Sequence, residues 1–229
     1  MDDNEEMIES KSESRQRDMF LLHLCCAPCS PHPILKLKEE FDLHLYFYNP
    51  NIHPESEYQM RLEEVEKLAR LEDLPLHVGD YRSEAWFNMT KGLENEPERG
   101  ARCRLCILDR LEYTARKAGE LGIHRFGSAL TTSPHKDSVM INEAGKHAAL
   151  ELVLFGYDIA FYEADFKKDD GFKISSELSK KYGFIRQDYC GCTYSRTERG
   201  KSKASAKMKK KAKTPTIDQG TVKPTVNPA

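Results

Sequence analysis

Residues 20–33, FLLHLCCAPCSPHP, decide how this chain folds. The first five residues are almost all apolar, and a short apolar run of this length is typical of a buried strand. Three cysteines and three prolines follow at once, where nucleotide-binding proteins of this architecture carry a glycine-rich turn that cradles phosphate. The segment therefore predicts a buried strand that ends in a thiol-bearing turn, and it argues against a nucleotide-dependent enzyme.

Strand and helix patterns alternate along the rest of the chain. Further strands are predicted at residues 43–48, 74–78 and 126–130, and helices at 34–41, 57–73, 103–122, 138–150 and 174–183. This alternation predicts an α/β fold with a Rossmann-like parallel sheet and helices on both faces. Ligands bind such sheets beyond the carboxyl ends of the strands, so the cysteine-rich loops are expected at that edge.

The two ends of the chain differ in charge from its middle. Of the 229 residues, 1–18 include seven acidic and three basic side chains, whereas 196–229 include ten basic and two acidic ones. Both ends are poor in large apolar residues and are predicted to be disordered. They flank one folded domain at residues 19–195. The lysine-rich tail either binds nucleic acid or is a solvated extension.

The sequence also indicates the compartment. No apolar run reaches the length of a membrane span, and the acidic N-terminus lacks the features of a secretory signal. We therefore expect a cytoplasmic protein without membrane contact, in which thiols stay reduced. Clustered cysteines in that setting favour metal or redox chemistry over structural disulfides.

All seven cysteines fall into three clusters. The clusters are Cys25, Cys26 and Cys29; Cys103 and Cys106; and Cys190 and Cys192. The spacing of Cys103 and Cys106 places both sulfurs on one helix face, within reach of one metal ion or cluster. Four thiolates suit an iron–sulfur cubane, and a structural zinc site is the alternative. The adjacent pair Cys25–Cys26 is unusual for a zinc ribbon, which favours iron–sulfur.

The third cluster has a different pattern. Cys190-Gly191-Cys192 can close a small disulfide ring, because glycine tolerates unusual backbone angles. Such a ring is strained and easily reduced. The pattern therefore favours a carrier of two electrons over a structural disulfide.

Polar residues on the other loops of the same edge are further candidates. Asn49, Asn51 and His53 follow the second strand and either bind a ligand or form turns. The candidate proton donors, each with an ordinary surface role as its alternative, are Asp188, His135, Lys136 and Asp109.

Nucleic-acid contacts have candidates as well. Arg61 and Arg110 either contact phosphate or form surface ion pairs. Tyr48, Tyr189 and Tyr194 are candidate platforms for a stacked base, with core packing as the alternative for Tyr48.

Five segments, in this order, resemble the QueH-type epoxyqueuosine reductases, the DUF208-like family. The segments are LHLCCAPCS, YFYNPNIHPESEYQMR, GARCRLCILDRL, SPHKDS with INEAGK, and IRQDYCGCTYS. The resemblance covers about residues 20–195 and leaves out both charged ends. It implies a HUP-like form of the Rossmann fold.

The resemblance also implies an activity and a cofactor. The implied reaction reduces the epoxide of epoxyqueuosine at wobble position 34 of a tRNA with a GUN anticodon. Its products are queuosine and water, and an unidentified donor supplies the electrons. The resemblance implies a 4Fe-4S cluster on Cys25, Cys26, Cys103 and Cys106, and an additional iron ion beside it. Cys190 and Cys192 match the position of a redox-active disulfide.

Some assignments stay open at this stage. Cys29, Asn49, Asn51 and Asp188 are candidates for the second metal or for substrate binding, and Cys29 alternatively only packs. The competing function is a zinc-stabilised RNA-binding module without redox activity, which would be colourless.

Overall fold

The computed structural model describes residues 17–212 and places five parallel strands in one sheet. The strands are β1 (Met19–Leu24), β2 (Asp42–Phe47), β3 (Leu76–Val78), β4 (Arg125–Ser128) and β5 (Ala160–Phe161). Their order is β3-β2-β1-β4-β5, with β1 at the centre and parallel to both neighbours. This is the order of a Rossmann-like sheet, so the predicted fold class is confirmed.

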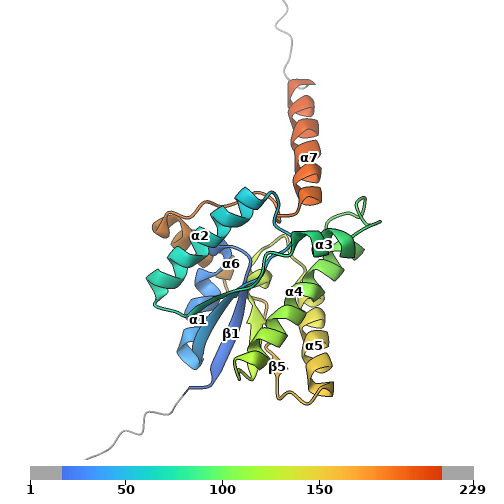
Figure 1. The fold of residues 1–229 in the computed structure, drawn as a ribbon. Coiled ribbons are helices and arrows are strands. Elements are labelled where there is room, and N and C mark those ends of the chain that lie inside the picture. The colour runs from blue at the N-terminus through green and yellow to red at the C-terminus, as the bar shows by residue number, and fades with distance from the viewer. Residues whose placement is uncertain (1–16, 213–229) are drawn as a thin grey trace, which may run out of the picture.

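Helices cover both faces of this sheet (Figure 1). The helices are α1 (Pro31–Glu40), α2 (Glu55–Glu72), α3 (Ser83–Met89), α4 (Ala101–Glu120), α5 (Ser138–Leu154), α6 (Gly171–Tyr182) and α7 (Thr193–Ala212). On one side of β1 lie α1, α2 and α6, and on the other lie α4 and α5. Short 3-10 turns follow β1 at Ala27–Cys29 and β4 at Ala129–Thr132.

The alternation of side chains along β1 explains these layers. Phe20, Leu22 and Leu24 pack into the core cluster beneath α1 and α2, while Leu21 packs into the cluster beneath α4 and α5. Successive residues of a strand point to opposite faces, so a strand that is apolar throughout needs a cover on both. Burial of each large apolar side chain contributes about 1.5–3 kcal/mol to the stability of the fold. This burial favours a central position for β1 in the sheet.

A buried histidine ties the carboxyl end of β1 to its neighbours. Nδ1 of His23 lies 3.0 Å from Oγ of Ser128 in β4, and Nε2 lies 3.1 Å from the carbonyl oxygen of Tyr48 after β2. The carbonyl oxygen accepts from Nε2, so Nδ1 accepts from the serine hydroxyl. Burial lowers the pKa of His23 to about 3, which keeps the ring neutral. The three strand ends that carry the candidate loops are therefore held together.

The sequence patterns missed β5, α3 and α7 and misplaced the end of β4. β5 has two residues and α3 has seven, both shorter than periodicity reveals. The strand predicted at 126–130 ends at Ser128, where the serine side chain caps the following 3-10 turn by accepting from the N–H of Leu130.

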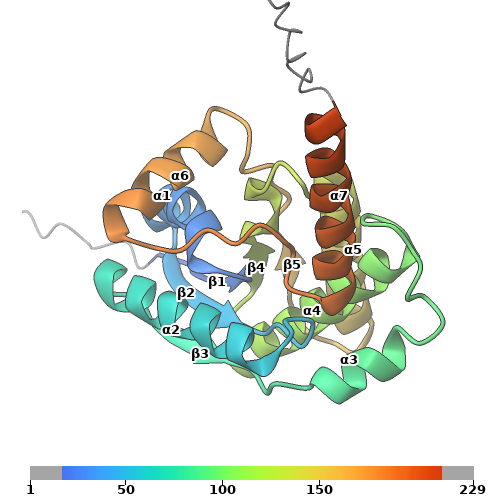
Figure 2. The same ribbon diagram turned by 90° about the horizontal axis from the view of Figure 1, so that it is seen from above.

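Helix α7 corrects the prediction that disorder begins at residue 196. The helix runs to Ala212 and stands away from the sheet at the carboxyl edge (Figure 2). Alanine, lysine and arginine are good helix formers, so a segment without large apolar residues can still be helical. The predicted disorder at residues 1–16 and 213–229 lies outside the described part of the chain. Within residues 17–212, no helix is long and apolar enough to cross a membrane.

Candidate active site

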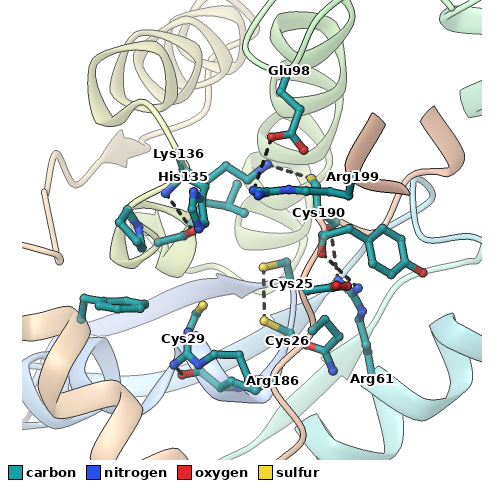
Figure 3. A pocket seen from close by; sticks show the side chains of 18 residues that line it. Cys25, Cys26, Cys29, Arg61, Glu98, His135, Lys136, Arg186, Cys190 and Arg199 are labelled. Carbon is teal, nitrogen blue, oxygen red and sulfur yellow. Dashed lines mark hydrogen bonds and ion pairs between the residues drawn. The ribbon is translucent and has the colours of Figure 1, made fainter. Parts of the chain in front are cut away.

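The first cysteine cluster follows directly from the end of β1. Cys25 leaves the strand and Cys26 precedes the 3-10 turn that carries Cys29. The sulfurs of Cys25 and Cys26 lie 3.8 Å apart. All three residues line a cavity of about 150 Å³ at the carboxyl edge (Figure 3). The turn therefore presents several thiols to one space, at the edge of the sheet where the cysteine-rich loops were expected.

The second cluster lies in the first turns of α4. Cys103 and Cys106 line a smaller cavity together with Cys190 and Cys192. Cys106 is 6% exposed, and burial raises the pKa of its thiol although the charge of Arg110 acts in the opposite direction. The positive end of a helix lowers the pKa of a nearby thiol, so for Cys106 the effect of burial is the larger one.

Cys190 connects the two cavities, because its side chain lines both. It stands in the loop before α7, next to Gly191, whose φ of +124° favours glycine. A Cβ at Gly191 would also lie 3.0 Å from Ile52 and 3.2 Å from Arg61. The loop is fixed by the N–H of His53, which donates to the Gly191 carbonyl oxygen at 2.8 Å.

The two cysteines of this loop differ in environment. Nζ of Lys136 donates to the Cys190 sulfur at 2.8 Å. Burial opposes ionisation of Cys190, but the charges of Lys136 and Arg110 outweigh it and lower the pKa. Burial and the neighbouring Cys190 instead raise the pKa of Cys192 to about 12. Its sulfur accepts from the N–H of Ser195 at 3.3 Å. All seven cysteines carry free thiols in the structure.

Besides Lys136, two arginines lie close to these sulfurs. Arg61 and Arg110 are 2% and 1% exposed, which corrects the prediction that they lie at the surface. Arg61 pairs with Glu57 at 2.7 Å. The charges that stabilise protonated Arg110 include the cysteines Cys106, Cys190 and Cys25. Buried cations need anionic partners, so the site fits a negatively charged group held by thiolates.

The asparagines after β2 have separate roles. Nδ2 of Asn49 donates to the carbonyl oxygen of Leu24 at 2.8 Å and so fixes the start of the cysteine turn. Asn51 lines the smaller cavity, and neither of its amide atoms has a hydrogen-bond partner among the described residues. His53 is also buried, and burial lowers its pKa to about 4. Asn51 is therefore better placed than Asn49 to contact a ligand.

The candidate proton donors divide in the same way. Asp188, His135 and Lys136 line the larger cavity. Asp109 lines neither described cavity and accepts from the hydroxyl of Tyr48 at 3.5 Å. Burial raises the pKa of Asp109. Its neighbours therefore give it a structural role away from the thiols.

The three tyrosines differ in exposure and neighbours. Tyr48 is buried and stacks on Tyr113 at a centroid distance of 4.4 Å, so it is a core residue. Tyr189 lines the larger cavity, with the guanidinium of Arg61 5.2 Å from its ring centroid. Tyr194 packs beside Trp86 at 5.9 Å. Tyr189 is thus the tyrosine that borders the larger cavity.

Sequence reasoning missed several residues that border the site. Arg186 lines the larger cavity beside Cys29 and donates to the carbonyl oxygen of Pro28 at 3.2 Å. Arg199 of α7 lines the same cavity and pairs with Glu98 at 3.9 Å. Trp86 lines the smaller cavity. Of these residues, only Trp86 could have been suspected from the sequence, because it is the single tryptophan of a highly charged chain.

Together the fold and the site define a class: α/β proteins whose parallel sheet carries a thiol-lined cavity at its carboxyl edge, suited to metal and redox chemistry. Residues 20–198 match the family model described as epoxyqueuosine reductase QueH. The chain belongs to this family, and it is an epoxyqueuosine reductase, an oxidoreductase.

Two curated relatives match this chain over most of their length. The epoxyqueuosine reductase QueH of Streptococcus pyogenes serotype M1 is 37% identical, over 91% of this chain and 82% of that protein. The one from Acinetobacter baylyi is 41% identical, over 78% and 80%. Among solved structures, U34-tRNA thiolase NcsA from Methanococcus maripaludis with its [4Fe-4S] cluster aligns with a TM-score of 0.48. It is 12% identical over 86% of this chain and 67% of that chain, too distant for a shared function to follow.

Proposed function

We propose that this chain reduces the epoxide of epoxyqueuosine at position 34 of a GUN-anticodon tRNA, using a 4Fe-4S cluster and a redox pair, Cys190 and Cys192. The QueH family acts on epoxyqueuosine-modified tRNA. The observation that carries the proposal is the position of Cys190, which lines one cavity with Cys25 and Cys26 and the other with Cys103 and Cys106. We assign these four other cysteines as the cluster ligands.

The residues fit a bound cluster in chemistry and in charge. Thiolate is the ligand that iron–sulfur clusters require, and Arg61, Arg110 and Lys136 supply positive charge around it. When bound, the cluster would supply electrons one at a time. Cys29 and Asp188 line the larger cavity, and we propose them as ligands for an additional iron ion.

The pair Cys190 and Cys192 supplies the remaining redox chemistry. Closing a disulfide between them releases two electrons and two protons. Removing the epoxide oxygen consumes these two electrons and two protons: two C–O bonds break, a C=C bond forms and the oxygen leaves as water. An external donor then reduces the disulfide again. Lys136, 2.8 Å from the Cys190 sulfur, stabilises the Cys190 thiolate and holds a proton beside it.

The substrate base is expected to enter the larger cavity. There Tyr189 lines the cavity beside Arg61, and Asn51 offers unpaired amide atoms in the adjoining smaller cavity. An anticodon loop presents unstacked bases that such side chains can bind. We propose that Asn51 binds the hydroxyls of the modified base.

Metal content and product analysis test the proposal. Anaerobically purified full-length protein is expected to be brown, with about four iron atoms per chain for the cubane. It is expected to convert epoxyqueuosine in tRNA to queuosine, measured on digested nucleosides. A colourless protein containing zinc would overturn the cluster but would leave the family assignment in place.

The basic end of the chain gives a separate prediction about tRNA binding. Arg199 in α7 lines the larger cavity. Residues 200–229, which follow it, contain eight lysines and one acidic residue. Deleting residues 200–229 is expected to weaken tRNA binding at low salt and to flatten the dependence of Kd on salt. Each lost phosphate contact lowers the log–log slope by about 0.7–0.9. Turnover at saturating tRNA should stay near that of the full chain.

A shorter deletion provides the control. Removing residues 214–229 takes away only Lys223 among the basic residues, so the salt dependence should remain close to that of the full chain. An unchanged slope in the longer deletion as well would make the basic segment a solvated extension.

A further inference from the structure

Trp86 is held against the sulfurs of two cysteine clusters. Its side chain is 2% exposed and packs in one apolar cluster with Cys106 and Cys192. On other sides it meets the rings of His53 and Tyr194, with centroid distances of 5.0 and 5.9 Å. Three elements far apart in sequence therefore fix the position of the indole beside the smaller cavity.

The indole N–H has no hydrogen-bond partner among the described residues. Buried indole N–H groups usually find one, and an indole can only donate. Cys106 packs with Trp86 in the same cluster and lines the same cavity, and its sulfur can accept a hydrogen bond. A thiolate at Cys106 would therefore supply the acceptor that the indole N–H lacks.

We propose that the indole N–H of Trp86 donates a hydrogen bond to the sulfur of Cys106 when this cysteine binds the cluster, and that this bond raises the reduction potential of the cluster. The inference rests on the proposed function, because it requires iron at Cys106. A donor to a cluster sulfur stabilises the reduced form, which carries the extra electron. Trp86 is thus a positioning residue that acts through a ligand.

Trp86→Phe tests this by removing the N–H while keeping an aromatic ring. The loaded variant is expected to hold its iron and to have a more negative midpoint potential than the wild type, measured by a spectroscopic redox titration. Phe87→Leu is the matched control, since Phe87 lies next in α3, contacts the indole ring and offers no donor. It should leave the potential unchanged, whereas equal potentials in all three proteins would overturn the proposal.

A measurement on the unaltered chain covers the case in which Trp86→Phe fails to load iron. Because Trp86 is the single tryptophan, labelling with ¹⁵N-indole tryptophan marks one nitrogen. Pulsed EPR of the reduced cluster is expected to detect a hyperfine coupling to that nitrogen. A labelled, fully loaded protein without the coupling would refute the bond.

These outcomes separate the two proposals. Failure of the wild type to bind any iron defeats the proposed function and this inference together. Normal iron loading with an unchanged potential and no ¹⁵N coupling defeats only the role of Trp86.

Discussion

Replacing Cys106 with serine is expected to abolish the visible absorbance of the purified protein and to remove the iron of the cubane, about four atoms per chain, which leaves at most the additional iron ion. Cys106 is buried beside Cys103, Cys190 and Cys192. Serine removes a soft thiolate that iron prefers, and a buried hydroxyl ionises far less readily. Turnover should fall to the background of the assay. Iron content, the visible spectrum and product formation are measured on the same anaerobic preparation.

The neighbouring residue provides a control for damage to α4. Ile107 is buried in the adjacent core, and Ile107→Val is expected to cost about 0.5–1.5 kcal/mol of stability while keeping the iron. A Cys106→Ser protein with wild-type iron and absorbance would remove Cys106 from the ligand set. Metal binding is coupled to folding, so thermal unfolding of each variant should be followed as well.

Cys192→Ser is expected to have a contrasting effect: the iron content and spectrum stay close to the wild type, while turnover on tRNA is lost. The reason is that Cys190 alone cannot close a disulfide and so cannot release two electrons. Titration of free thiols gives an independent measure. Mild oxidation should remove two thiols from the wild type through this pair, and this loss should be absent in the variant.

Thr193→Ala is the matched control, because Thr193 follows Cys192 directly and carries no thiol. It is expected to turn over and to lose two thiols on oxidation as the wild type does. Loss of the chromophore in Cys192→Ser would instead make Cys192 a cluster ligand. Normal turnover with an intact spectrum would show that electron transfer does not need the pair.

The difference between Cys190 and Cys192 gives a direction to their chemistry. The cations Lys136 and Arg110 favour the thiolate of Cys190, whereas Cys192 is kept protonated by burial and by its neighbour. The thiolate is the reactive form of cysteine. We therefore infer that Cys190 reacts first and that Cys192 closes the ring, so the proton of Cys192 is released only in the second step.

Local sequence determined the sheet and the location of the thiols. The apolar run before Cys25 can bury both of its faces only as a central strand. The helix that contains Cys103 and Cys106 was recognisable from the helical spacing of its apolar residues. Because the connections make the strands parallel, the carboxyl ends of the strands lie at one edge of the sheet. Local sequence did not determine α7, because a lysine-rich segment without apolar residues is compatible with both a helix and a disordered tail.

Tertiary structure alone decided which partners those residues meet. Helical spacing puts Arg61 and Arg110 on definite faces of their helices, but the charges opposite them come from other elements. Both arginines are buried beside cysteines, although charged side chains are usually exposed. Likewise, Cys190 meets Lys136 across 54 positions, and Trp86 meets Cys106 from a separate helix. Periodicity specifies only which way a side chain faces. Packing between distant segments decides which groups that side chain meets, and those groups set its protonation state and reactivity.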